Sequence, residues 1–296
     1  EWLEGSAGGR IGYTSTGNEI KLQDVKRSRS FVLAGMGAEY HFTNTTEVYA
    51  NYSQAYRPIQ FANLQAPPTT DVVDPNLKDA KGFNVDLGYR GKVKNFLQFD
   101  ISGFFLQYNN RVGTITPTGA SYRLITNVGN STSKGFEGYA EIDLLKAFAN
   151  NRFKNADLSV FGSYGYTNAT YSGDHKDAQT KGKKIENAPV NILRTGITGG
   201  NKNFSITVQL SYVDAAFSDA NNTVKASANG QTGLIPSYAV TDFTATYKYN
   251  KNLNIKGGLN NVFDKRYFTR RAGGYPGPGA LPGDGRTFFI SVGAKF

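Results

Sequence analysis

The chain has 296 residues, with 18 Tyr, 20 Phe, 34 Gly, one Met, no Cys and a formal net charge of +10. The absence of Cys excludes disulfides and thiolate metal sites, and the lack of any run of about 18 apolar residues excludes a membrane-spanning helix. A membrane β-barrel is left open, because its strands need only about 9 to 11 residues of alternating polarity. The charge would suit nucleic acid, anionic lipid headgroups or an anionic solute, so the distribution of the basic residues has to decide.

The opening residues, up to about Arg29, are interpreted as the end of a preceding strand and its long loop. They contain no basic segment followed by an apolar one, so we expect no signal peptide here. Beyond them, apolar residues alternate with polar or small ones about eleven times, which is the pattern of β-strands with two different faces. The predicted strands begin near Phe31, Glu47, Phe83, Asn95, Phe136, Leu158, Val190, Phe204, Val240, Leu253 and Thr287.

The last predicted strand shows the alternation most clearly. One face carries only apolar side chains, and the other carries small or polar ones except for Phe289; the apolar set is Phe288, Ile290, Val292, Ala294 and Phe296. The same rule extends the strand that begins at Phe136 as far as Leu144. This separation predicts that one face of each strand contacts lipid and the other faces a polar interior.

Short connections alternate with long ones along the chain. The short ones are predicted at His41–Thr46, Gly91–Lys94, Lys146–Asn155, Gly199–Lys202 and Asn250–Lys251. The long ones are predicted at Pro58–Asp79, Asn110–Ser133, Asn168–Ala188, Ala215–Pro236 and Asp264–Gly285. An outer-membrane barrel has short periplasmic turns and long extracellular loops, so the chain is predicted to end on the periplasmic side. Aromatic residues expected near the short turns would form a girdle at headgroup depth: Tyr40, Phe42, Tyr89, Tyr247 and Tyr249.

We therefore predict an all-β fold, namely an antiparallel transmembrane β-barrel. About 11 strands is an unusual total, because single-chain bacterial barrels normally have an even number, and half of a barrel of about 22 strands fits better. An open sheet of this size would expose two edges and an apolar face to water. Residues 1–296 are accordingly interpreted as the C-terminal part of a barrel domain whose first strands are absent from this chain.

Four sequence motifs suggest a family. They are Tyr49–Pro58 (YANYSQAYRP) followed by Asp74–Lys78 (DPNLK), Asn127–Ser131 followed by Ser133–Glu137 (SKGFE), Leu259–Tyr267 (LNNVFDKRY), and the terminal Phe296. In this order they resemble the barrel of TonB-dependent receptors, and the resemblance covers nearly the whole chain. Within that family, Thr269–Arg271, Gly274–Gly279 and Gly283–Arg286 look most like the ferric-citrate-receptor branch.

The resemblance implies a bacterial outer-membrane receptor for a ferric chelate, ferric citrate or another siderophore. It implies no cofactor, since iron would be bound only as part of the transported chelate. A plug domain and the segment that contacts TonB would belong to an N-terminal part that is absent from this chain. It also implies that the barrel assembly machinery recognises the terminal apolar stripe, whose members are Phe288, Ile290, Val292 and Phe296.

The predicted long loops and strand ends carry the candidate substrate-binding residues. These are Arg57, Gln60, Asn63, Arg111, Arg123, Arg270, Arg271 and Arg286. Arginine offers a planar fork that binds carboxylates through two hydrogen bonds, so a converging set could hold an anionic chelate. The same arginines could instead contact anionic lipopolysaccharide of the outer leaflet or pair with neighbouring Asp and Glu. The Pro and Gly residues of 274–285 suggest a loop of fixed course, serving as a substrate lid or only closing the lumen.

Other function classes lack the residues they need. His41 and His175 have no helical metal-binding spacing, and the triplet of Ser172, Asp174 and His175 is of a kind that polar loops produce by chance, so we expect no enzyme. Nucleic-acid binding would need aromatic side chains beside the basic ones, whereas here the aromatics alternate onto the lipid side. The alternatives left open are a passive porin or diffusion channel and a surface adhesin barrel.

Overall fold

In the computed structural model of the chain, the described residues are 2–15, 19–60, 71–115, 123–149, 152–153, 155–173, 180–272 and 279–295. Side chains are described from residue 29 onward, except for those of Asp71, Thr114 and Arg123. No helix among these residues is long and apolar enough to cross a membrane.

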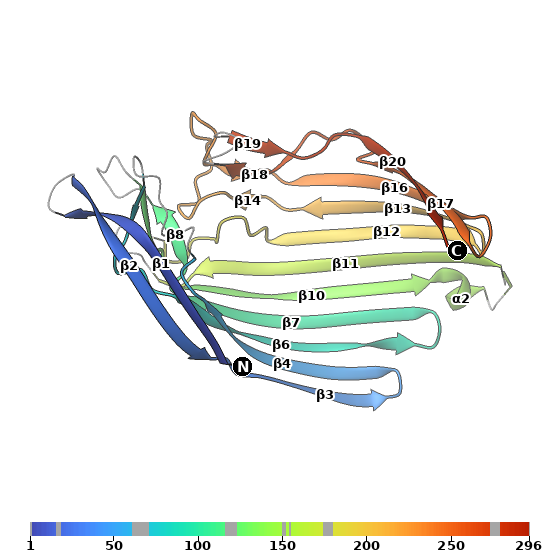
Figure 1. Ribbon diagram of the computed structural model, residues 1–296. Coiled ribbons are helices and arrows are strands. Elements are labelled where there is room, and N and C mark those ends of the chain that lie inside the picture. The colour runs from blue at the N-terminus through green and yellow to red at the C-terminus, as the bar shows by residue number, and fades with distance from the viewer. Residues whose placement is uncertain are drawn as a thin grey trace.

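The molecule is built on one curved antiparallel sheet of eleven strands (Figure 1). Each strand pairs with the preceding and the following strand of this sheet, in chain order, and β3 and β20 form the two open edges. The strands are β3 (Gly35–Thr43), β4 (Thr46–Arg57), β6 (Ala80–Val93), β7 (Leu97–Asn109), β10 (Ser131–Asp143), β11 (Ala156–Tyr171), β12 (Asn191–Asn201), β13 (Phe204–Val213), β16 (Tyr238–Lys248), β17 (Leu253–Asn260) and β20 (Thr287–Ala294). The eleven predicted strands are thereby confirmed.

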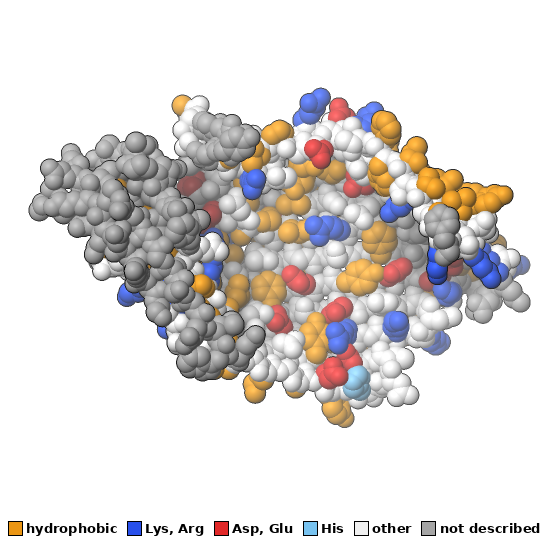
Figure 2. All heavy atoms as spheres, viewed as in Figure 1, with side chains coloured by type: hydrophobic (Ala, Val, Ile, Leu, Met, Phe, Trp, Pro, Cys, Tyr) orange, Lys and Arg blue, Asp and Glu red, His pale blue; other side chains and the backbone are white. Residues whose placement is uncertain are grey.

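The register separates the two faces of the sheet. On what we call the outer face, Tyr89 pairs with Val48 and Ile101, whereas on the inner face its neighbour Arg90 pairs with Glu47 and Asp100. Figure 2 shows charged side chains spread over the middle of the inner face. Apolar side chains of the outer face are largely exposed, for example Phe288 at 82% and Ile290 at 75%.

The sheet has no apolar core of its own among the described residues. The fully buried apolar side chains lie toward one end of the strands, in the long loops or beside them: Ile59, Val72, Val73, Leu77, Ala80, Val128, Ala169, Tyr171, Ile185, Ala216 and Ile235. An extended apolar face that packs against no other part of the protein is stable only where something other than water covers it. Strands of 8 to 16 residues with such a face fit a bilayer, and every described strand of the sheet has a hydrogen-bonded neighbour.

Connections sort by length onto opposite ends of the sheet, which we call the turn end and the loop end. The turn end has residues 44–45, 94–96, 144–155, 202–203 and 249–252, and the loop end has residues 58–79, 110–130, 172–190, 214–237 and 261–286. The predicted alternation is confirmed, but two turns lie a few residues later than predicted. Gly91 and Gly200 lie within strands, where a side chain would collide with Thr46 and with the Phe204 carbonyl, so they mark close backbone approach. Lys94 makes the first of these turns with a φ of 51°.

A second correction concerns Leu144, which was predicted to continue a strand. The strand β10 ends at Asp143, whose side chain accepts a hydrogen bond from the Lys146 backbone N–H at 2.9 Å. This cap starts the short helix α2 (Leu144–Phe148). Apolar alternation alone cannot detect such a stop, because Asp143 fits the polar position of the strand equally well.

The long loops contain small strands of their own. These are β5 (Asp71–Val73), β8 (Val112–Ile115), β9 (Arg123–Asn127), β14 (Ala216–Phe217), β15 (Leu234–Ile235), β18 (Phe268–Ala272) and β19 (Gly279–Pro282). The strands β5, β8 and β9 form a three-stranded sheet in which β5 and β9 are parallel, in contrast to the antiparallel main sheet. Val73, Val112 and Ile125 of this sheet pack with Ile59 and Leu77 in one apolar cluster.

The opening residues form a hairpin where a strand end and a loop were predicted. The strands β1 (Trp2–Ser15) and β2 (Glu19–Val32) pair along their whole length outside the main sheet (Figure 1). The predicted loop is thus itself a two-stranded ribbon. The β1 sequence does alternate, with Leu3, Ala7, Ile11 and Tyr13 out of phase with Glu4, Ser6, Arg10 and Thr14, which agrees with the predicted strand end. The β2 sequence has polar residues in both phases, so it lacks the one-sided apolar pattern that identified the other strands.

Candidate functional site

The loop end is the candidate site, because its loops form one connected layer. The first link is Asp79, at the end of the loop 58–79. One of its carboxylate oxygens accepts hydrogen bonds from Tyr56 and Arg29, and the other accepts from the Ile59 backbone N–H at 2.9 Å. Burial by itself would raise the pKa of Asp79, but these donors and the Arg29 charge outweigh it and hold the pKa below its usual value. The carboxylate therefore fixes the start and end of this loop.

The second link joins the loops 110–130 and 172–190. Arg111 donates to Glu186 at 3.0 Å, and the Tyr171 hydroxyl donates to the other oxygen of Glu186 at 2.6 Å. Burial opposes the charged form of Glu186, yet the Tyr171 hydrogen bond and the Arg111 charge keep its pKa below the usual value. Tyr171 packs with Val128, Ala169 and Ile185 in a buried cluster beside this ion pair.

Further links continue through the remaining loops. Asn222 exchanges hydrogen bonds with both backbone groups of Lys184, at 2.7 and 2.8 Å, and so joins the loops 172–190 and 214–237. Arg271 donates at 3.0 Å to the carbonyls of Gly230 and Leu234, which joins the last loop to the same neighbour. All five long loops are thereby connected in chain order within the described residues, since Asn127 also bonds both backbone groups of Lys78.

The predicted substrate-binding arginines with described side chains fall into two groups, those that are exposed and those that bond to neighbouring loops. Arg57 and Arg111 line one hollow of about 370 Å³ at the loop end, together with Tyr108 and Ser133. Arg57 is exposed and donates to Gln60 at 3.3 Å, so these two predicted residues lie together. Arg111 is committed to Glu186.

The C-terminal arginines differ in the same way. Arg270 and Arg286 are exposed, whereas Arg271 is half-buried and lies over the Phe268 ring at 4.9 Å. The Arg286 backbone N–H donates to Asp264, whose pKa is lowered by that hydrogen bond and by nearby arginines. Asn63 and the Arg123 side chain lie outside the described part of the structure, although the Arg123 backbone pairs with Asp71.

The inner face carries functional candidates that the sequence interpretation did not single out. A hollow of about 400 Å³ is lined by Tyr49, Asp100, Glu137, Tyr139 and Arg194 from four strands and by residues between them. Tyr49 donates to Asp100 at 2.9 Å, and the Arg90 guanidinium lies 4.9 Å from the Tyr49 ring centre. The period of two already placed these side chains on one face, so the signal was present. Only the strand register brings them together.

A family model described as TonB-dependent receptor-like β-barrel matches residues 2–262. The chain belongs to this family. Members of this TonB-dependent receptor family are outer-membrane β-barrel proteins, and the family consists of receptors and transporters.

Individual relatives of this TonB-dependent receptor chain match it at low identity. The probable TonB-dependent siderophore receptor PiuA of Acinetobacter baumannii is 24% identical over 287 residues, covering 92% of this chain and 35% of its own length. The vitamin B12 transporter BtuB of Photobacterium profundum is 24% identical over 239 residues, covering 79% of this chain and 34% of BtuB. The unliganded ferric citrate transporter FecA superposes with a TM-score of 0.74 at 23% identity, covering 94% of this chain and 40% of FecA. This chain thus spans about a third of the length of these curated relatives, and the structural likeness shows the shared fold.

The terminal stripe of this receptor chain lies where the prediction placed it. Phe288, Ile290 and Val292 share the outer face of β20, and all three are largely exposed. Phe296 lies outside the described residues. Three of the five residues predicted for an aromatic girdle form an outer-face cluster at the turn end, where Phe42 lies 5.1 Å from Tyr40 and 6.4 Å from Tyr89. Tyr247 and Tyr249 are exposed at the same end, and a girdle at headgroup depth stays a prediction.

Proposed function

We propose that this chain is the C-terminal part of the barrel of an outer-membrane receptor that imports an anionic ferric chelate. The observation that carries the proposal is that three of the predicted arginines at the loop end are exposed and take part in no salt bridge among the described residues. Asp79 and Glu186 are both engaged within the loop layer. In contrast, Arg57, Arg270 and Arg286 form no salt bridge with any described residue and are exposed. Three exposed guanidinium groups without a salt bridge, on a connected layer, favour a ligand rich in carboxylates.

Two of the remaining predicted arginines would support the site through contacts between the loops. Arg111 and Arg271 hold neighbouring loops together, so their contribution to binding would be to position Arg57 and Arg270. Citrate is a tricarboxylate, which makes ferric citrate the first chelate to test. The cargo names of the relatives include a siderophore, vitamin B12 and ferric citrate, so family membership alone does not select among them.

We also propose that the plug domain and the other barrel strands belong to the same polypeptide, because the relatives are far longer than the matched region. In this proposal iron is cargo, bound only within the chelate, and TonB acts through the part outside this chain. Family membership does not favour a passive porin, and no described feature supports an adhesin.

Lipid partners are proposed from the outer face. Lys81 and Lys134 are exposed and lie two residues from Phe83 and Phe136, on the loop-end side of both aromatics. Phe83 contacts Phe105 and Phe136 contacts Tyr166, with ring centres 5.9 and 5.5 Å apart. Aromatics at headgroup depth with lysines just beyond them fit the anionic outer leaflet of lipopolysaccharide.

We also propose that the barrel assembly machinery recognises the terminal apolar stripe. Deleting Phe296 is therefore expected to lower the amount of receptor inserted into the outer membrane without lowering its synthesis.

The test uses the intact receptor with Arg57, Arg270 and Arg286 changed to Glu. We expect at least a tenfold loss of affinity for ferric citrate in a binding titration, with unchanged receptor in the membrane. Lys251→Glu, at the exposed turn end, is the matched control for charge reversal. Equal affinity of the triple variant and the control would refute the arginine site. If neither the wild type nor any variant binds an anionic ferric chelate, the proposed function fails.

A further inference from the structure

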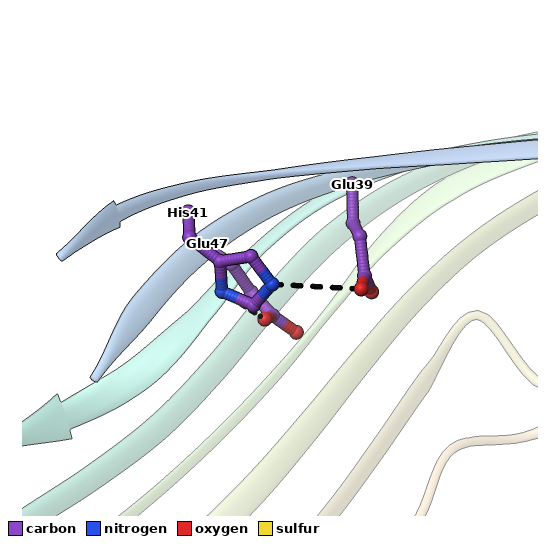
Figure 3. Close-up of side chains that lie close together, drawn as sticks. All are labelled: Glu39, His41 and Glu47. Atoms are coloured by element: carbon purple, nitrogen blue, oxygen red, sulfur yellow. Dashed lines mark ion pairs between the residues drawn. The ribbon is translucent and has the colours of Figure 1, made fainter. Parts of the chain in front are cut away.

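A cluster of metal-ligating side chains lies at the turn end, away from the loops. Glu39 and His41 project from β3, and Glu47 projects from β4 (Figure 3). His41 Nδ1 lies 2.9 Å from Glu47 Oε2, and His41 Nε2 lies 3.5 Å from Glu39 Oε1. One ligand atom from each of the three residues falls within 4.8 Å of the others. Among the described residues, no other group of three such side chains lies this close together.

The strand ladder fixes this arrangement. His41 pairs directly with Glu47, and Glu47 pairs directly with Arg90 on β6, so these side chains form one row on the inner face. Glu39 is two residues from His41 on the same face of the same strand. Ligands on paired strands are held more accurately than ligands on loops. The backbone therefore already presents three ligands toward a common point.

The chemistry of the cluster favours a cation. Each imidazole nitrogen of His41 faces a carboxylate oxygen, and carboxylate oxygens together with an imidazole nitrogen are ligands that divalent transition metals take. A divalent ion bound to one nitrogen would also neutralise the two carboxylates. Arg90 donates to Glu47 and lies 3.9 Å from Glu39, and Lys92 lines the same hollow as His41 and Glu47. In this same position the Arg90 guanidinium also lies 4.9 Å from the centre of the Tyr49 ring.

The surroundings leave room for the remaining ligands. Glu39 and His41 side chains are each 57% exposed, and Glu47 is 16% exposed. A hollow of about 610 Å³ adjoins the cluster and is lined by His41, Asn44, Glu47 and Arg90, among others. Water can therefore complete the coordination of an ion that takes three protein ligands.

We propose that Glu39, His41 and Glu47 bind a divalent first-row transition-metal ion, with one imidazole nitrogen and two carboxylates as ligands. Such mixed nitrogen and oxygen ligands suit zinc, with bonds of about 2.0 to 2.2 Å. On binding, the ion replaces Arg90 as the partner of Glu47. This site is separate from the arginines of the loop end and does not depend on which solute the receptor imports.

The experiment is a calorimetric titration of Zn²⁺ into the intact, chelator-washed receptor in detergent. We expect one zinc ion per chain, at least tenfold weaker binding in His41→Gln and Glu39→Gln, and several-fold tighter binding in Arg90→Gln because the competing cation is gone. His175→Gln changes the other histidine of the chain and should leave the titration unchanged. Heat-modifiable mobility on gels checks that each variant is folded.

Opposite responses of Arg90→Gln and His41→Gln would distinguish a coordinated ion from general attraction to acidic groups. Adventitious zinc on surface carboxylates would respond equally to His41→Gln and His175→Gln, and that result would overturn the proposal. Absence of zinc binding in folded Arg90→Gln receptor would overturn it as well. A cobalt-substituted sample provides a second readout, since its visible absorption should change in His41→Gln and not in His175→Gln.

Discussion

Arg111 and Glu186 lie 3.0 Å apart although they are 75 positions apart in the sequence and belong to different loops. Both are mostly shielded from water, with side-chain exposures of 29% and 21%. Because Glu186 also accepts from Tyr171, removing one partner of the pair leaves the other with an incomplete set of bonds. The pair is therefore one link between the second and third long loops, beside the hydrogen bond from the Ser172 backbone N–H to the Asn130 carbonyl at 2.9 Å.

Arg111→Leu is expected to weaken the contact between the loops 110–130 and 172–190 by about 1 to 3 kcal/mol, since it leaves a shielded carboxylate without its cation. Hydrogen exchange measured by mass spectrometry should become faster in both loops and stay the same in β6 and β7. The exposed Ser172→Ala is the control in the same region. Unchanged exchange in Arg111→Leu would mean that the pair does not join the loops.

The loop layer should depend on pH in the acid range. The pKa values of Asp79 and Glu186 lie below their usual values of 3.8 and 4.5, so the contribution of each group is complete above the usual value and is lost as the pH falls through the lowered one. We expect constant loop protection from pH 7 to about 5 and increasing exposure below about 4. Susceptibility of the loops to an acid protease measures this, and Asp79→Asn should remove part of the dependence. A loss of protection between pH 7 and 5 would contradict the assignment.

Adjacent arginines of β18 should give separable effects. Arg271 holds two carbonyls of the loop 214–237, so Arg271→Ala should increase hydrogen exchange in that loop. Arg270 is exposed and has no such bonds, so Arg270→Ala should reduce chelate affinity and leave exchange unchanged. The comparison needs only these two variants and the wild type. If Arg270→Ala loosened the loop as much as Arg271→Ala, the division between ligand contact and loop support would be wrong.

The two faces of the last strand should respond oppositely to charge. Ile290→Lys places an ammonium on the exposed apolar face, where near the bilayer midplane the cost is about 2 to 4 kcal/mol. Ser291→Lys puts the same group on the inner face, where water is available, so its cost should be limited to the weak repulsion from Lys256 on the paired strand. The amount of folded receptor in isolated outer membranes should fall in the first variant only. Equal membrane levels of the two variants would mean that the apolar face of β20 does not contact lipid at Ile290.

Much of the main sheet could be predicted because its signal is local. Alternation along each strand is sufficient to assign Phe288 and Ser291 to opposite faces, and it also gives the strand number and the alternation of short and long connections. The errors occur where one residue type serves two purposes. Gly91 and Gly200 suggested turns but allow close packing within strands, and Asp143 suited a strand while capping a helix.

The loop layer could not be predicted from the sequence, because its contacts join residues that no period relates. Nothing near Arg271 in the chain indicates that its guanidinium is taken up by the carbonyls of Gly230 and Leu234, and an arginine of this kind is indistinguishable in sequence from the exposed Arg270. The cluster of Glu39, His41 and Glu47 was missed for a related reason. Its members face one another only once the register of β3 and β4 is known.

The chain-order links between the five loops have a mechanical consequence. A loop that is bonded on both sides cannot swing outward by itself, so displacement of any one must strain the hydrogen bonds to its neighbours. The five loops would then open together in one cooperative step with a single barrier, and would not fluctuate independently. A single engineered cross-link between two neighbouring loops should accordingly restrict the motion of all five.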